Sequence, residues 1–353
     1  MSKMGFMVSG ENFVWSHRGL LRIKELKKDD MVLGIDRKGK PHWSTIPNGI
    51  QKHGRTRILR ITTDGNEILL PENCEVFTME GVRKASNLVK GDLLETFNIP
   101  KEVRLLLEGK EATYVMTDIG PVTIKDKMAY LLGTQIKCRK YEHKVIISGL
   151  NPDNAYTLAK ICSEALREQF IQGKIYYVAG GRKVRINCHV LASVCGDISE
   201  RSISLSVRET NANALKEFLC GILDVMLYLD EAESPPTYFQ TFEDQSELRR
   251  FIFNVLRLYE VIPAKTYVIS PSEGPIYMRT FIDVPDLSGL GLRFIRSKKA
   301  IEVVKPQFEK MSYSTVRKVV EFKDSSYYFS EPKLHWSPIV ELTPLHRHIR
   351  ART

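Results

Sequence analysis

The sequence predicts an α+β protein of several domains, in which an all-β part is interrupted by a doubled α/β part. The chain has 353 residues, which corresponds to two or three domains at about 100–200 residues each. Short apolar runs separated by turn dipeptides fill residues 7–96, whereas amphipathic helical patterns alternate with strand pairs from about residue 124. Strand-like alternation returns from about residue 327. The order is therefore β, then a doubled α/β segment, then β.

The first part is predicted to be almost entirely β-strand. It includes the runs VWSHRGLLRI, RILRITT and NEILL, and Asp64-Gly65 lies between the last two. Asp-Gly accepts the positive φ that tight antiparallel turns require, so we expect a hairpin at this point.

The middle part contains one α/β unit in two copies. In the first copy, a helix over MAYLLGTQI precedes the strand HKVIISG, the helix NAYTLAKICSEALREQF and a strand pair around Gly180-Gly181. The second copy has the helices ANALKEFLCGILDVMLYL and SELRRFIFNVLRLYE, followed by the strand pair AKTYVISPSEGPIYMRTFID. We expect domains at residues 1–115, 116–310 and 311–353, with the two copies at about 124–214 and 215–300.

Composition indicates the class of partner and the compartment. The chain has 52 Lys and Arg against 42 Asp and Glu, a net charge of +10 that favours a polyanionic partner. No stretch approaches the roughly 20 apolar residues of a membrane helix, and the N-terminus lacks the apolar core of a signal peptide. We expect a soluble, cytoplasmic protein with no membrane partner. Its six cysteines contain no CxxC pair, so we expect free thiols, no metal site and no cofactor.

Four blocks in the first part resemble, in order, the Hint domain of inteins. They are SGENFVWSHRGLLRIKEL, MVLGIDRKGK, PENCEVFTMEG and ASNLVKGDLL. Near the C-terminus, WSPIVELTPL resembles the strand that completes such a domain after an inserted endonuclease. The resemblance implies an all-β horseshoe that is interrupted by the middle part.

Two segments of the middle part resemble the motifs of LAGLIDADG (DOD-type) homing endonucleases. They are LLGTQIKCR and LCGILDVML, about 90 residues apart. The resemblance implies a pseudo-symmetric αββαββ saddle over DNA, whose two motif helices pack together at Gly133 and Gly221. A side chain at either glycine would hold the helices apart.

At the splicing positions that the resemblance implies, the reactive residues are missing. Met7 occupies the position of the first nucleophile, and a thioether cannot attack the preceding carbonyl. Ser9 lies two residues away, about 7 Å along an extended strand. The histidine block reads Pro-Glu-Asn-Cys, with Cys74 at its end, and no asparagine follows Asn254.

The nuclease positions are changed as well. Cys138 and Met226 stand where the family has its metal-binding carboxylates, and neither is a suitable ligand for Mg²⁺. Asp224 precedes Met226 by two residues, a rotation of about 200° on a helix, so we expect it on the opposite side. We therefore expect no catalytic residue and no bound metal.

The leading hypothesis is a domesticated, catalytically inactive intein-like protein whose saddle binds duplex DNA. In that family antiparallel sheets lie over the major groove, so the strands carry the contacts. The candidate contact residues are Lys137, Arg139, Lys140, Lys174, Lys183, Arg185, Asn187, Lys265 and Arg279. Two alternatives stay open: an active LAGLIDADG endonuclease or self-processing intein, and a scaffold that binds protein or RNA.

Overall fold

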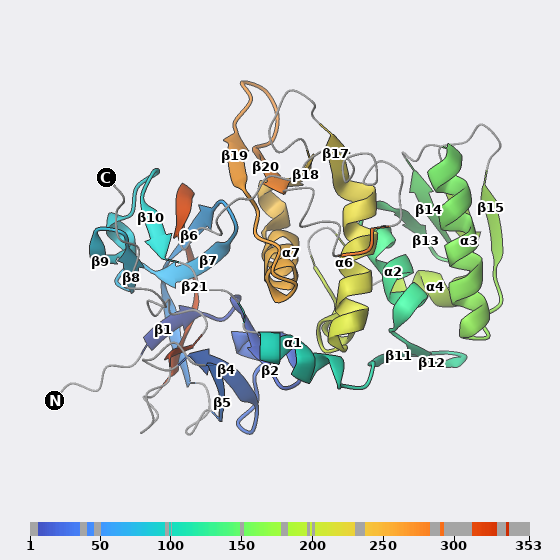
Figure 1. Ribbon diagram of the computed structural model, residues 1–353, viewed down its shortest axis with the longest axis horizontal. Helices are drawn as coiled ribbons and strands as arrows, with labels where there is room; N and C mark the ends of the chain where they lie inside the picture. The colour runs from blue at the N-terminus through green and yellow to red at the C-terminus, as the bar shows by residue number, and fades with distance from the viewer. Residues whose placement is uncertain are drawn as a thin grey trace. The chain divides into compact units, whose positions relative to one another are not determined.

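The computed structural model describes residues 6–35, 41–45, 51–95, 99, 101–148, 152–177, 183–195, 198–199, 202–229, 237–282, 290–292, 313–329 and 337–338 (Figure 1). It is a mixed α and β structure whose strands pair in antiparallel sheets. The chain divides into two compact units. The β unit comprises Met1–Pro100, Lys265–Val268 and Gln307–Thr353, and the α/β unit comprises Lys101–Ala264 and Ile269–Pro306. The expected domain limits at residues 115 and 310 stay predictions.

Two sheets form the β unit. One has the order β7-β6-β21-β10-β8-β9, with β1 beside β21, and the other has the order β22-β4-β2-β3, with β5 beside β4. The strands of the first sheet are β1 (Phe6–Ser9), β6 (Gln51–Thr63), β7 (Glu67–Pro71), β8 (Glu75–Thr78), β9 (Gly81–Lys84), β10 (Leu93–Glu95) and β21 (Tyr313–Phe329). Those of the second are β2 (Phe13–Ser16), β3 (Gly19–Arg22), β4 (Met31–Ile35), β5 (Pro41–Thr45) and β22 (Ser337–Pro338).

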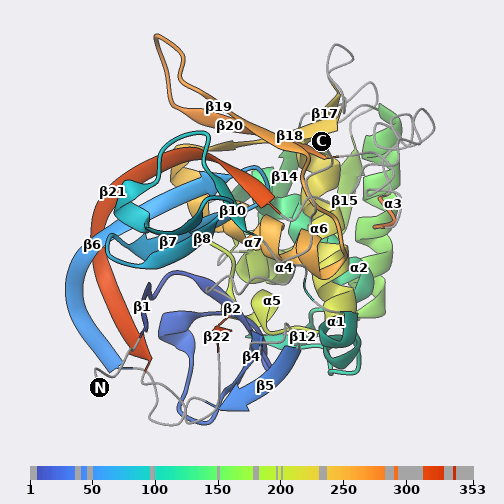
Figure 2. The same ribbon diagram turned by 60° about the vertical axis from the view of Figure 1, so that its left-hand side comes forward.

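The pairing of β6 with β21 joins distant parts of the chain, and Figure 2 shows the two as a long curved pair. The hairpin predicted at Asp64-Gly65 is confirmed, because β6 and β7 pair with Thr62 opposite Glu67. The Asp64 carboxylate accepts hydrogen bonds from Nε and Nη2 of Arg317 in β21, at 2.8 and 2.9 Å. This bidentate contact fixes the turn to the strand that comes from the other end of the sequence.

The α/β unit repeats one arrangement of helices and strands. The first copy has α2 (Asp126–Thr134), β13 (Arg139–Tyr141), β14 (Lys144–Ser148), α3 (Pro152–Glu168), β15 (Lys174–Tyr177) and β16 (Lys183–Asn187). The second has α6 (Ala212–Met226), β17 (Leu227–Leu229), β18 (Thr237–Phe242), α7 (Ser246–Leu258) and β20 (Tyr277–Ile282), and β20 pairs with β19 (Lys265–Ile269), of which the first four residues are counted in the β unit. The sheet orders, β13-β14-β16-β15 and β17-β18-β20-β19, correspond strand for strand.

Both motif helices end earlier than their patterns predict. The first continues only as a 3-10 turn over Gln135–Lys137, and the second gives way to β17 at Leu227. The remaining elements of the unit are α1 (Lys101–Glu108), β11 (Tyr114–Thr117), β12 (Gly120–Thr123), α4 (His189–Val194) and α5 (Leu205–Arg208). None of the described helices is long and apolar enough to cross a membrane.

Candidate nucleic-acid interface

The two motif helices, α2 and α6, touch through their backbones. A Cβ added at Gly133 would lie 3.0 Å from the backbone nitrogen of Ile222 and closer still to the carbonyl oxygen of Phe218. A Cβ at Gly221 would lie 3.0 Å from the nitrogen of Thr134 and closer still to the oxygen of Tyr130. Only glycine permits this approach on both helices, because each Cβ site is occupied by main-chain atoms of the partner helix.

Each motif helix leads directly into one of the two sheets. β13 follows α2 after the 3-10 turn, and β17 follows α6 without a break. The contact between the helices at Gly133 and Gly221 therefore joins the two points of the α/β unit from which the first strands of the two sheets start. In Figure 1 the strands β13 to β15 lie to the right of α2 and α6, and β17 continues upward from the end of α6.

The end of α2 carries a neutral thiol at the position that the resemblance assigns to the first metal-binding carboxylate. Burial raises the pKa of Cys138 well above the ordinary thiol value, to about 11, and nearby Lys140 opposes this effect only in part. The thiol is therefore protonated at neutral pH. A protonated thiol is an even poorer ligand for Mg²⁺ than a thiolate.

The end of α6 carries a buried thioether and a carboxylate. Met226 is completely buried. Asp224, which we expected on the opposite side of the helix from Met226, accepts at its Oδ2 a hydrogen bond of 2.9 Å from the Tyr130 hydroxyl of α2. Tyr130 of α2 therefore contacts Asp224, which lies about one helical turn after Gly221 in α6. Asp224 is thus half-buried in the helix contact.

The outer face of the first sheet is cationic. Burial alternates along β16, where Val184 and Ile186 are buried and Lys183 and Arg185 are exposed. Residues that are opposite each other in antiparallel strands point to the same face. The register therefore places Arg139, Tyr141, Lys144, Ile146, Ser148, Lys174, Tyr176, Lys183, Arg185 and Asn187 on one face. Five of these residues are cations, and none of the residues in these four strands is acidic.

Tyrosine rings hold two of these cations. The guanidinium carbon of Arg185 lies 4.5 Å from the ring centroid of Tyr176, its cross-strand neighbour. The ammonium nitrogen of Lys144 lies 4.7 Å from the ring centroid of Tyr141. Cation–π contacts restrict these long side chains before any partner arrives, which lowers the entropy cost of binding an anion.

Lys140 does not belong to this face, although the sequence grouped it with Arg139. Its neighbour across the strands is Val145, which is fully buried, and its ammonium group donates to the carbonyl oxygen of Cys195. Because strand side chains alternate, adjacent residues cannot both point outward. For Lys137 the structure describes the backbone only, within the 3-10 turn. Lys144 was missed, although the alternation in HKVIIS could have revealed it.

The outer face of the second sheet is mainly aromatic. Of the expected residues, Arg279 stacks on Tyr238 at 5.1 Å and on Tyr277 at 5.8 Å, and Lys265 lies 5.1 Å from the ring of Tyr267. Sequence reasoning missed Tyr238 because its strand, β18, was not predicted.

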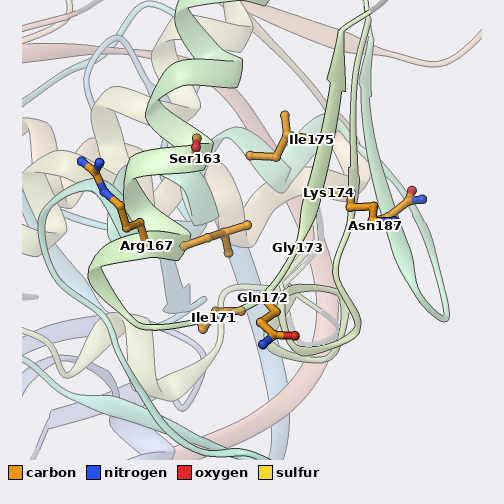
Figure 3. Close-up of a pocket in the computed structure, with 9 residues that line it drawn as sticks. Ser163, Arg167, Ile171, Gln172, Gly173, Lys174, Ile175 and Asn187 are labelled. Atoms are coloured by element: carbon orange, nitrogen blue, oxygen red, sulfur yellow. The ribbon is translucent and has the colours of Figure 1, made fainter.

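A cavity of about 640 Å³ lies where the last turn of α3 meets the start of β15 (Figure 3). It is lined by Ser163, Leu166, Arg167, Ile171, Gln172, Gly173, Lys174, Ile175 and Asn187. This set contains two cations but no histidine, cysteine or carboxylate that could act as a general acid or base.

The two positions that the resemblance assigns to splicing lie in the β unit, Met7 on a strand and Cys74 in the turn between β7 and β8. Met7 is in β1, opposite Tyr328 of β21, and β1 also contacts β7. Cys74 follows β7, and its Sγ lies 3.6 Å from the carbonyl oxygen of Glu75. Ser9 is fully buried, and its hydroxyl oxygen accepts a hydrogen bond from the Glu11 nitrogen at 3.2 Å. Among the described residues, no cluster of three or more His, Cys, Asp or Glu could hold a metal ion.

The fold thus defines an antiparallel β unit with an α/β unit of two related halves, and comparison with solved structures finds relatives of two kinds. Over 27% of its length the chain is similar to the DnaX mini intein from Spirulina platensis, with 23% identity, a TM-score of 0.24 and 69% of that chain covered. Over 46% of its length it is similar to mesophilic variants of the homing endonuclease I-DmoI, with 14% identity, a TM-score of 0.36 and 91% of that chain covered.

A second I-DmoI structure, in complex with DNA and Mn, gives 17% identity, a TM-score of 0.35 and 93% of that chain covered. No protein-family model matches the sequence. No curated protein matches it either. An intein and a homing endonuclease are the two classes that the sequence resembles.

Proposed function

We propose that the chain binds duplex DNA through its α/β unit, with the cationic outer face of the β13–β16 sheet on the duplex, and that it neither splices nor cleaves. The observation that carries the proposal is the face of the β13–β16 sheet, with five cations and no acid on its strands. A duplex carries one negative charge per about 1.7 Å of helix axis, so such a face is attracted to it whatever the sequence. Antiparallel strands also have the dimensions to enter the major groove.

The α/β unit would act as a LAGLIDADG-type saddle, and the β unit as a Hint-type horseshoe. The repeated sheet order and the mutual approach of Gly133 and Gly221 support the first assignment. The pairing of β21 and β22 with N-terminal strands supports the second assignment. When a β domain is interrupted by an insertion, its last strands must come back to pair with its first strands.

The proposal that the chain catalyses neither splicing nor DNA cleavage rests on the chemistry of the side chains at the positions concerned. Cys138 presents a half-buried neutral thiol, Met226 a thioether and Met7 another thioether, and none of the three can replace a carboxylate or a splicing nucleophile. Asp224 is a single carboxylate, and two-metal hydrolysis in general uses a set of oxygen ligands from both sides. We therefore assign the unit a binding role.

Fluorescence anisotropy on a random 30-base-pair duplex, titrated with KCl, tests the proposal. If about five to seven phosphates are contacted, affinity falls by roughly 10³-fold between 50 and 200 mM salt. Absence of binding at 50 mM salt would refute it, and a shallow salt dependence would favour the protein-interaction scaffold. The same duplex incubated with Mg²⁺ should stay intact, whereas breaks that a chelator prevents would favour the active endonuclease.

A further inference from the structure

The two sheets of the α/β unit share one topology but present different chemistry. The outer face of the β17–β20 sheet carries aromatic side chains where the first sheet carries cations. Its members in register are Tyr228, Tyr238, Gln240, Phe242, Tyr277, Arg279 and Phe281. None of the residues in these four strands is acidic, and the cations among them are Arg279 and Lys265. We call this surface the tyrosine face.

The rings of the tyrosine face form a continuous row across three strands. Tyr228 of β17 stacks on Tyr238 of β18, with 5.5 Å between centroids and 24° between planes. Tyr238 contacts Phe281 of β20 at 5.2 Å, with a tilt of 37°. The row is open at one end, because Tyr228 is 39% exposed, and closed at the other, where Phe281 is 1% exposed.

A cation is built into this row. The guanidinium carbon of Arg279 lies 5.1 Å from the centroid of Tyr238 and 5.8 Å from that of Tyr277. The row therefore offers π faces for stacking together with a positive charge held between two rings. Single-stranded nucleic acids are bound by this combination, in which bases stack on aromatic rings while cations follow the phosphates.

Paired bases cannot use such a surface, because in a duplex each base is already stacked on its neighbours. We propose, as an extension of the proposed function on which it rests, that the tyrosine face binds unpaired nucleotides by stacking a base on Tyr228, which Tyr238 supports from behind, with Arg279 at the phosphates. The cationic face of the first sheet holds the duplex, so the preferred ligand is a duplex with an unpaired segment.

The alternative is that the rings only stabilise the sheet, as cross-strand aromatic pairs do in many antiparallel sheets. The two explanations differ in what the rings do for a ligand. If the rings are only structural, they raise the free energy of unfolding but do not change the relative affinities for different nucleic acids. A stacking platform discriminates between ligands with and without unpaired bases.

The test compares a blunt 20-base-pair duplex with the same duplex carrying a tail of about eight unpaired nucleotides, and with the tail strand alone. Tails of DNA and of RNA are separate arms that identify the source of the bases. For the unmodified protein, the tail should tighten binding by about tenfold or more, since a single stacked base contributes that order of affinity. A 2-aminopurine in the tail should lose fluorescence on binding, because stacking quenches it.

Two double variants separate stacking from stability. Tyr228→Leu with Tyr238→Leu should abolish the tenfold gain and the quenching, while binding of the blunt duplex is unchanged. Tyr228→Phe with Tyr238→Phe keeps both rings and should keep the gain. The 2-aminopurine measurement on the unmodified protein decides the matter even if the leucine variant fails to fold.

The outcomes distinguish this inference from the proposed function. Equal affinity for blunt and tailed duplexes, with no quenching, would refute the tyrosine face as a site and leave duplex binding standing. A gain from the tail that survives the leucine variant would also refute it. Binding of the tail strand without any binding of blunt duplex would support the tyrosine face and overturn the proposed function.

Discussion

Replacement of Gly133 by alanine probes the contact between α2 and α6 most severely. The new methyl carbon would lie 3.0 Å from the nitrogen of Ile222 and from the carbonyl carbon of Phe218, and nearer still to the Phe218 oxygen. All three atoms are main chain, so no rotamer change relieves the clash, and the helices must move apart. Overpacking costs about 1–3 kcal/mol and occasionally more, and a clash with main-chain atoms lies at the upper end, about 3 kcal/mol, whereas alanine regains about 1 kcal/mol of helix propensity. We expect a net loss of about 2 kcal/mol in the free energy of unfolding.

The assay is urea unfolding followed by far-UV circular dichroism, together with thermal unfolding. A loss of 2 kcal/mol corresponds to a shift in Tm of roughly 4–8 °C for a unit of this size. Gly109→Ala is the matched control, because a Cβ there meets its nearest atom at 3.6 Å, an ordinary contact. If Gly133→Ala unfolds at the same urea concentration as Gly109→Ala, the helices do not depend on this approach and the reasoning is wrong.

Three further predictions address the nuclease and splicing positions. Because burial raises the pKa of Cys138 to about 11, its thiol should stay neutral to well above pH 9; alkylation at pH 8 should be roughly 100-fold slower than for an ordinary thiol and should accelerate towards pH 11, as measured by peptide mass spectrometry. Tyr130→Phe removes the hydroxyl that donates to Asp224 and should lower the free energy of unfolding by about 1 kcal/mol. An unchanged free energy of unfolding would mean that this hydrogen bond does not stabilise the fold. Expressed between two reporter domains, the chain should remain full length, and joined reporters on a gel would overturn the interpretation of Met7.

Much of the α/β unit could be predicted from the sequence, because its helices carry strong amphipathic periodicity and its long hairpins are local. The strands β13 and β17 were missed for two physical reasons. Arg139–Tyr141 is short and polar, so no apolar alternation marks it. Leu227–Leu229 continues an apolar helix without a breaker, so only tertiary pairing with β18 decides that it becomes a strand.

The candidate site was predictable as a set of cations but not as a face. Alternation along β16 correctly separated Lys183 and Arg185 from their buried neighbours. Lys140 was assigned to the same surface because β13 was not recognised as a strand. In a strand, successive side chains point to opposite faces, so Lys140 and Arg139 cannot share one. The stacking of Tyr228 on Tyr238 depends on a pairing between β17 and β18, and no local signal reports the register of such a pair.

The central claim is that the cationic face of the first sheet contacts phosphates, and the salt dependence of binding measures this directly. The slope of log affinity against log salt should be determined for the unmodified protein and for Lys183→Ala with Arg185→Ala. The control, Lys24→Ala with Lys127→Ala, removes the same charge, but from lysines that are already paired with carboxylates. The slope should fall by about 0.9 for each phosphate that the variant no longer neutralises, so by nearly two for the first pair and not at all for the control. Equal slopes for the two pairs would contradict the claim, because binding would then depend on net charge alone and not on this face.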